Sequence, residues 1–254
     1  MNRAVTDYWI DEGTGHGRAY QFRTPGGHLG EIFWNVERFV APQQDASVFR
    51  NRAQRRSNVG SPARFLHHAN LSTARLSEDV AFFTELLGFK FNEAIRIPIG
   101  VEIFAALACT NLDHDLGLTR DPEGLGGRLN HLAYYLESRE QVLLAADAAL
   151  EAGLEIELGP TKHGIGESFF LYVRDPGSQQ RVEIYSGGYL NFEPDRPTVI
   201  WSIAERPHPM LAWGGEMPAA FGGGGMAEIM RSRAGQRGAT QGESSSASSK
   251  PEGG

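Results

Sequence analysis

The sequence predicts an α+β fold in which paired βαβββ modules form a funnel-like mixed sheet around a metal site. A pattern of one strand, one helix and three strands occurs twice between residues 64 and 221. Each copy opens on an apolar strand that carries a histidine, and these are His68 and His131. The last strand of the second copy carries Glu183. Two histidines and one carboxylate are a donor set typical of transition-metal sites. We therefore expect the modules to face each other across these three side chains.

The first module begins with the strand RFLHHANLS. A helix is predicted over Leu76–Leu87, because apolar residues recur there at helical spacing and Gly88 supplies a stop. The apolar face of this helix consists of Val80, Phe83 and Leu86/Leu87. Three β-rich runs follow, at Lys90–Arg96, Val101–Cys109 and His114–Thr119.

The second module repeats this order, starting with the strand RLNHLAYYL. Ser138 and Gln141 fit a capping box at the start of a helix, and Gly153 ends it. The buried face of that helix is predicted to be Val142, Leu143, Ala146 and Leu150. The closing strands are expected near Leu154–Leu158, Ser168–Val173 and Arg181–Tyr185.

Strand alternation decides which side chains converge. Leu66, His68 and Asn70 share one face of the first strand and should point into the funnel. The opposite face, which should pack on the helix, consists of Phe65, His67, Ala69 and Leu71. The same reasoning turns His131 inward, away from Leu132, Tyr134 and Leu136, and turns Glu183 away from Val182 and Ile184. One histidine in a strand is ordinarily structural, but three ligand-type residues with consistent faces favour a metal site.

The ends of the chain have a different character. FRTPGGHLGEIF (22–33) matches VRDPGSQQRVEIY (173–185), so residues 1–40 are predicted to be the last hairpin of a further βαβββ domain. Residues 41–63 are polar and predict a linker, and 64–221 form the catalytic unit with a C-terminal extension. Residues 222–254 are rich in Gly and Ser and predict a disordered tail. Glu31 occupies the place of Glu183 in the partial repeat, and we expect it not to bind metal.

Composition excludes several classes of partner. The net charge is -7 with scattered basic residues, which argues against a nucleic-acid surface. No apolar run approaches the roughly 20 residues that span a bilayer. The N-terminal residues do not resemble a signal peptide, and the single cysteine, Cys109, cannot form an internal disulfide. We therefore expect a cytoplasmic protein.

At this point the residues closely resemble a known family, the type I extradiol dioxygenases of the vicinal oxygen chelate superfamily, and within it the catechol 2,3-dioxygenases (metapyrocatechases). The resemblance covers about residues 17–215. It is most specific in RLNHLAYYLESREQVLLAAD, GPTKHG and SGGYLNFEP, and in Trp201. The family signature stands here as His163, Leu171, Tyr172, Asp175-Pro176 and Glu183. One residue more than usual precedes Glu183, and we expect a local bulge to absorb it.

The resemblance implies a function. His68, His131 and Glu183 match the iron(II) ligands, and His114 matches the acid–base histidine beside the oxygen position. His163 and Tyr172 match the pair that hydrogen-bonds the catecholate oxygens. The implied reaction is extradiol cleavage of a catechol with O2 to a 2-hydroxymuconic semialdehyde-type product, in aromatic compound degradation. The family is usually homo-oligomeric and carries a complete N-terminal domain, so we expect the chain to begin inside a folded domain and to show weak activity.

Alternatives remain open. Another vicinal oxygen chelate enzyme, glyoxalase-like or hydroxyphenylpyruvate-type, would share the fold, although the former typically uses more carboxylates with zinc or nickel. An inactive or binding-only homologue would usually lack the three metal ligands. The set of His114, His163 and Tyr172 favours catechol cleavage over both enzyme alternatives.

Overall fold

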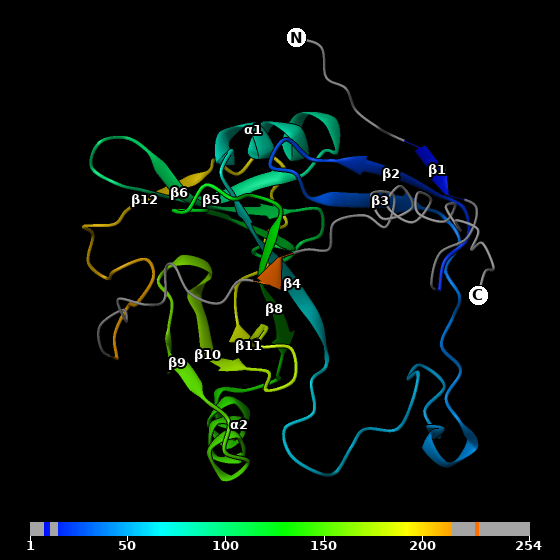
Figure 1. Ribbon diagram of the computed structural model, residues 1–254. Helices are drawn as coiled ribbons and strands as arrows, with labels where there is room; N and C mark the ends of the chain where they lie inside the picture. The colour runs from blue at the N-terminus through cyan, green and yellow to red at the C-terminus, as the bar shows by residue number, and fades with distance from the viewer. Residues whose placement is uncertain (1–7, 11–14, 215–226, 229–254) are drawn as a thin grey trace, which may run out of the picture.

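The first module has the predicted order of elements. The computed structural model of the chain describes residues 8–10, 15–214 and 227–228 (Figure 1). The module contains β4 (Phe65–Thr73), α1 (Leu76–Ala81), β5 (Lys90–Arg96), β6 (Glu102–Ala108) and β7 (Leu116–Arg120). β6 pairs antiparallel with β5 and β7, and β7 returns parallel beside β4. This return places the first and last strands of the module side by side.

The second module repeats that arrangement. It contains β8 (Arg128–Tyr135), α2 (Arg139–Glu151), β9 (Ile156–Lys162), β10 (Ser168–Arg174) and β11 (Arg181–Gly187). β10 pairs antiparallel with β9 and β11, and β11 lies parallel to β8. Ser138 caps α2 by accepting a hydrogen bond from the Gln141 amide at 3.4 Å, as the capping box predicts.

The two modules join through β4 and β8, which pair antiparallel at the centre of one continuous sheet. The sheet order is β12-β5-β6-β7-β4-β8-β11-β10-β9, where β12 (Val199–Ser202) lies parallel to β5. β13 (Ala227–Glu228) pairs with β8 beside this path. The predicted fold of paired βαβββ modules is therefore confirmed.

Two β-bulges interrupt the central strand pair. The register of β4 against β8 shifts between Leu66 and His68, which leaves His67 as an extra residue. It shifts again between Asn70 and Leu71, opposite His131 and Leu129, so Asn130 is the extra residue on β8. Each bulge residue directly precedes one of the two predicted ligand histidines. Because a bulge breaks the two-residue alternation of faces, the predicted faces of β4 do not hold on both sides of His67.

The helices cover the sheet with apolar residues, although not always those that the pattern predicts. One core cluster joins Leu76, Val80 and Phe83 of the first helical segment to Leu107 and Leu118. α1 continues as a π-helical turn over Phe82–Leu86, and Gly88, with a φ of 72°, follows as the predicted stop.

The prediction was wrong for part of α2. Leu143 and Leu150 are 50% and 64% exposed, while the buried residues of this helix are Val142, Ala146 and Ala149. The second core cluster joins Val142 and Ala146 to residues of β10 and to Leu136.

An N-terminal hairpin docks on the first module. β2 (Ala19–Arg23) and β3 (Leu29–Phe33) pair antiparallel, with β1 (Tyr8–Ile10) at the edge, and Figure 1 shows this small sheet beside α1. The Gly26 amide donates to Asp79 Oδ1 at 2.8 Å. Nε2 of buried His28 lies 3.0 Å from the carbonyl oxygen of Ser72. The hairpin is thus attached to the catalytic unit through its turn.

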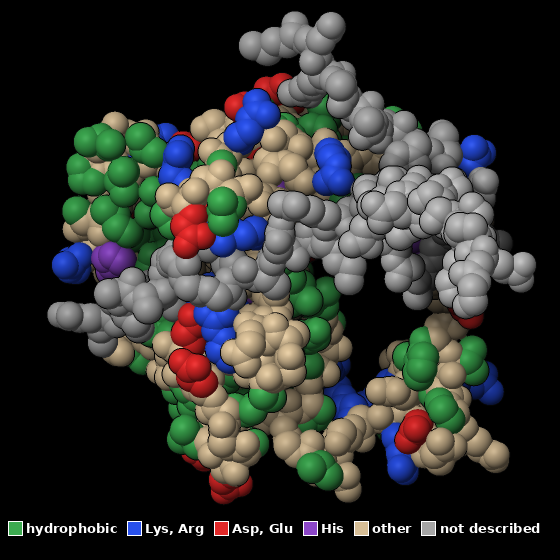
Figure 2. All heavy atoms as spheres, viewed as in Figure 1, with side chains coloured by type: hydrophobic (Ala, Val, Ile, Leu, Met, Phe, Trp, Pro, Cys, Tyr) green, Lys and Arg blue, Asp and Glu red, His purple; other side chains and the backbone are tan. Residues whose placement is uncertain are grey.

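The linker and the C-terminal tail are predictions from composition. Residues 41–63 contain one short 3-10 turn, Gln43–Asp45, and most of their side chains are exposed. The space-filling view shows this segment standing apart at the lower right (Figure 2). Most of the predicted tail, 222–254, lies outside the described residues. The division into domains stays a prediction.

We expected a bulge to absorb the extra residue before Glu183. The structure instead absorbs it in the turn between β10 and β11. β10 and β11 keep continuous register from Ser168↔Gly187 to Arg174↔Arg181. The intervening turn instead places Gln179 at a φ of 59°, in the left-handed region. The strand that carries Glu183 is therefore regular.

Candidate metal centre

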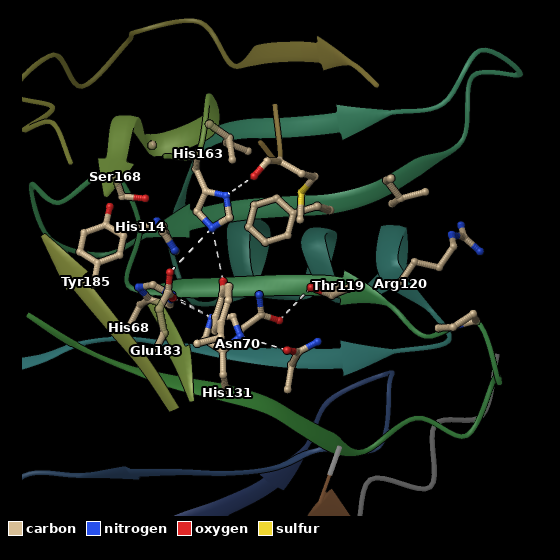
Figure 3. Close-up of a pocket in the computed structure, with 18 residues that line it drawn as sticks. His68, Asn70, His114, Thr119, Arg120, His131, His163, Ser168, Glu183 and Tyr185 are labelled. Atoms are coloured by element: carbon tan, nitrogen blue, oxygen red, sulfur yellow. Dashed lines mark hydrogen bonds and ion pairs between the residues drawn. The ribbon is translucent and has the colours of Figure 1, made fainter. Parts of the chain in front are cut away.

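The three predicted ligands come together on neighbouring strands. His68 lies on β4, His131 on β8 and Glu183 on β11, which are adjacent in the sheet. Nε2 of each histidine lies 3.1 Å from Glu183 Oε2, and the two Nε2 atoms are 3.1 Å apart. All three residues are buried, and Figure 3 shows them pointing toward one another. Each side chain offers one donor atom, and the three atoms lie close enough together to bind one metal ion.

The donor set fits a divalent cation. Within the part of the chain that the structure describes, neither carboxylate oxygen of buried Glu183 receives a hydrogen bond. Such a group is costly unless a cation or donor compensates it. Burial lowers the pKa of His68 and of His131, and a neutral imidazole is the form that binds metal. Two neutral imidazoles and one unsatisfied carboxylate leave room for a metal and for further ligands on it.

A cavity of about 360 Å³ opens at the three ligands. Its volume suits a small aromatic molecule. Its apolar lining residues include Ile103, Phe104, Pro122, Ile165 and Met210. Arg120 also lines the cavity, at a distance from the histidines in the close-up view (Figure 3). The cavity thus offers an apolar wall opposite a polar, ligand-bearing end.

His114 lies at the polar end, against His68. The two ring centroids are 3.9 Å apart, and Nδ1 of His114 is 2.7 Å from Asp113 Oδ2. Burial would lower the pKa of His114, but the Asp113 carboxylate outweighs this effect and raises the pKa above its ordinary value. A cation at the ligands would oppose that rise. His114 is therefore a buried group able to gain or lose a proton beside the metal centre.

His163 and Tyr172 lie on the other side of Glu183. Nδ1 of His163 faces the carbonyl oxygen of Met210, while Nε2 is 3.4 Å from the Tyr172 hydroxyl and 3.8 Å from Glu183 Oε1. Burial lowers the pKa of His163 to about 4, so the ring is neutral near pH 7. With Nδ1–H donating to Met210, Nε2 is left as an acceptor that faces the cavity. Burial also raises the pKa of Tyr172 well above its ordinary value, so its hydroxyl remains a donor.

Several neighbours of the site were not foreseen as functional. Asn70 lines the cavity, on the face that alternation gave it, and accepts a hydrogen bond from Thr119. Tyr185 donates to Asp113 Oδ2 at 2.9 Å. Asp113 is the residue directly before His114 in the chain. Its role as a buried hydrogen-bond acceptor depends on tertiary contacts, which a sequence pattern does not predict.

His67 lies where the prediction did not place it. It is buried beside His68, and its ring centroid is 4.2 Å from that of Tyr185. It does not pack on the helix, because the bulge turns its side chain toward the ligand strand pair. Burial lowers the pKa of His67 to about 4. Among the described residues, the three-residue metal cluster does not include it.

Comparisons with known proteins agree with this geometry. The profile of the Glyoxalase/Bleomycin resistance protein/Dioxygenase superfamily matches residues 65–184. The chain is 40% identical over 212 residues to a manganese-dependent 2,3-dihydroxybiphenyl 1,2-dioxygenase of Geobacillus genomosp. 3, covering 82% of this chain and 67% of the relative. It is 36% identical to a metapyrocatechase of Geobacillus stearothermophilus, covering 81% and 62%. The homoprotocatechuate 2,3-dioxygenase of Arthrobacter globiformis superposes with a TM-score of 0.73 at 27% identity, covering 87% and 66%.

Fold and donor set together define a metal-binding protein of the paired βαβββ class. The chain belongs to the Glyoxalase/Bleomycin resistance protein/Dioxygenase superfamily, and within it to the extradiol ring-cleaving dioxygenases. The predicted family is thereby confirmed. The chain spans about two thirds or less of the length of these relatives. No helix among the described residues is long and apolar enough to cross a membrane.

Proposed function

We propose that the chain is an iron(II)-dependent extradiol dioxygenase that opens a catechol with O2 to a 2-hydroxymuconic semialdehyde-type product. The observation that carries this proposal is the convergence of His68, His131 and Glu183 at the end of a cavity. His114, His163 and Tyr172 line that same end. His68, His131 and Glu183 would hold the iron, which would supply a centre for electron transfer between a catecholate and O2.

His163 and Tyr172 would bind and orient the catechol. Nε2 of His163 accepts a hydrogen bond, and the Tyr172 hydroxyl donates one, so the pair can hold one protonated and one ionised substrate oxygen. Both groups are buried, which strengthens each interaction with the substrate because water competes less. Their place beside Glu183 keeps the substrate oxygens on the metal-ligand side of the cavity.

His114 would transfer protons. Its Nδ1 is held by Asp113 at 2.7 Å, which leaves Nε2 as the nitrogen that can exchange a proton with a reacting oxygen. The carboxylate stabilises the charged ring when it gains a proton, as a general acid–base pair requires. The packing of His114 against His68 keeps it within reach of a ligand on the metal.

The identity of the metal is part of the proposal. Iron(II) and manganese(II) both accept two histidines and one carboxylate, and one relative is named as manganese-dependent. We propose iron(II) for this chain. The test is to remove metal with a chelator, reconstitute anaerobically with iron(II) or manganese(II), and measure product formed per bound metal from a panel of catechols. Higher activity with iron supports the proposal, and activity with manganese alone contradicts it.

Two further elements of the proposal concern alternatives and setting. A glyoxalase-like or hydroxyphenylpyruvate-type reaction would not need His163 and Tyr172 as a catechol-binding pair, and the panel separates these reactions by oxygen uptake and product. We also place the protein in the cytoplasm as a homo-oligomer, with a catechol and O2 as its small-molecule partners. Size-exclusion chromatography with light scattering tests the oligomer.

A further inference from the structure

The two ligand histidines are held by matched neighbours. Nδ1 of His68 lies 3.0 Å from Nδ1 of His67, and Nδ1 of His131 lies 3.0 Å from Oδ1 of Asn130. His67 and Asn130 are the two bulge residues of the central strand pair. Each bulge therefore brings the residue before a ligand back onto the ring of that ligand. The same arrangement of bulge residue and ligand histidine therefore occurs in both modules, with a histidine in one and an asparagine in the other.

The ligand role decides the direction of these contacts. A histidine that binds a metal through Nε2 carries its proton on Nδ1, which must then donate. His131 can donate to the amide oxygen of Asn130. His68 can donate only if Nδ1 of His67 accepts, which places the proton of neutral His67 on its own Nε2.

That proton points toward Asp113. Nε2 of His67 is 3.5 Å from Asp113 Oδ1, and both side chains are 1% exposed. Oδ1 has no hydrogen-bond partner among the described residues, so it is available to accept a hydrogen bond from Nε2 of His67. The second oxygen, Oδ2, already binds Nδ1 of His114 and the hydroxyl of Tyr185. Asp113 thus contacts both His67, the neighbour of His68, and His114, the proposed acid–base residue.

We propose that His67 is a positioning residue that orients His68 through Nδ1 and links it, through Asp113, to His114. This inference rests on the proposed metal site and deepens it. The bulge makes the link possible, because a regular strand would turn His67 to the opposite face from His68. When a residue that hydrogen-bonds the non-ligating nitrogen of a metal-bound histidine is removed, metal affinity or activity typically falls by about 10–100-fold.

Two substitutions separate the two parts of this role. His67→Leu removes both contacts. His67→Asn keeps an acceptor for His68, in the manner of Asn130, but cannot reach Asp113. Leu66→Ala, at a half-exposed neighbour on the same strand, is the matched control for disturbance of β4. Circular dichroism and thermal melting of the metal-free proteins check that each variant folds.

The readouts are metal affinity and turnover. Affinity is measured by competition of the apo-protein with a chromophoric chelator for cobalt(II) and iron(II), and the visible spectrum of bound cobalt reports the ligand geometry. We expect H67L to lose about 10–100-fold in affinity with an altered cobalt spectrum. H67N should recover the affinity and spectrum of the parent but turn over more slowly at saturating metal. L66A should match the parent throughout.

The contrary outcomes are distinct. If H67L binds metal as tightly as the parent with the same spectrum, the orienting role is wrong while the proposed function stands. If H67N turns over like the parent, the link to Asp113 is wrong. If the parent itself takes up no metal, the proposed function and this inference both fail.

Discussion

The Nε2 atoms of His68 and His131 lie 3.1 Å apart, although the two residues are separated by 63 positions in the chain. β4 and β8 bring them together because these strands pair antiparallel at the junction of the two modules. Glu183 completes the cluster from β11, the next strand. The candidate metal site thus lies beside the strand pair that joins the two modules.

Removal of any one ligand should abolish metal binding. We expect His68→Ala, His131→Ala and Glu183→Ala each to lose stoichiometric iron and activity, because each removes one of three protein ligands. Glu31→Ala is the matched control, since Glu31 occupies the corresponding place in the N-terminal hairpin and pairs with His16. Metal content after desalting checks this. Full iron in a ligand variant, or lost iron in E31A, would contradict the assignment.

Replacement of His114 should slow turnover without removing the metal. His114→Phe keeps an aromatic ring against His68 but removes Nε2, the nitrogen proposed to exchange a proton, and the Nδ1 contact with Asp113. We expect kcat to fall on the order of 100-fold or more, with metal content unchanged. Steady-state kinetics on the iron-loaded protein measures this. Parental kcat would remove His114 from the mechanism.

The metal-free protein should lose stability as the pH falls. The pKa values of His67 and His163 are lowered to about 4, mainly by burial, from 6.5. The unfolded chain then binds more protons than the folded chain between pH 6.5 and 4, so stability present above pH 6.5 is lost across this range. Each residue contributes at most about 3 kcal/mol. Urea unfolding of the parent and His163→Gln at several pH values tests this, and equal losses in both proteins would contradict it.

The docked hairpin should be sensitive at Gly26. A Cβ there would lie 2.2 Å from Asp79 Oδ2 and 2.3 Å from Thr73 Oγ1. Gly177 occupies the same place in the matching turn, and the nearest atom to its Cβ would be 3.7 Å away. We expect Gly26→Ala to cost about 1–3 kcal/mol and to expose the hairpin to protease, while Gly177→Ala does not. Thermal melting and limited proteolysis compare the two, and equal behaviour would show that the contact with Asp79 does not hold the hairpin.

Sequence reasoning located the fold and the metal cluster because both depend on local periodicity. The repeated order of elements placed His68 and His131 on the opening strands of the modules and Glu183 on the last strand, and the structure brings the three together. It was wrong about the environment of His67, because a single inserted residue changes which face of a strand the next side chains occupy.

The same limit applies to the helices and to the polar neighbours. Leu143 and Leu150 match the apolar period of α2 yet face solvent. Periodicity does not reveal how much of the apolar face of a helix the sheet will cover. Asp113 contacts its neighbour His114, and it also contacts Tyr185 of β11 and His67 of β4. One sequence does not display the two contacts with distant strands.

Ring cleavage itself is the most direct test of the proposed function. The metal-free chain is reconstituted anaerobically with iron(II), mixed with catechol and O2, and followed by oxygen electrode, absorbance and mass spectrometry. We expect one O2 to be consumed per catechol and a yellow semialdehyde to form, by cleavage between a hydroxyl-bearing carbon and its unsubstituted neighbour. An iron-loaded protein that consumes no O2, or a colourless product cleaved between the two hydroxyls, would contradict it.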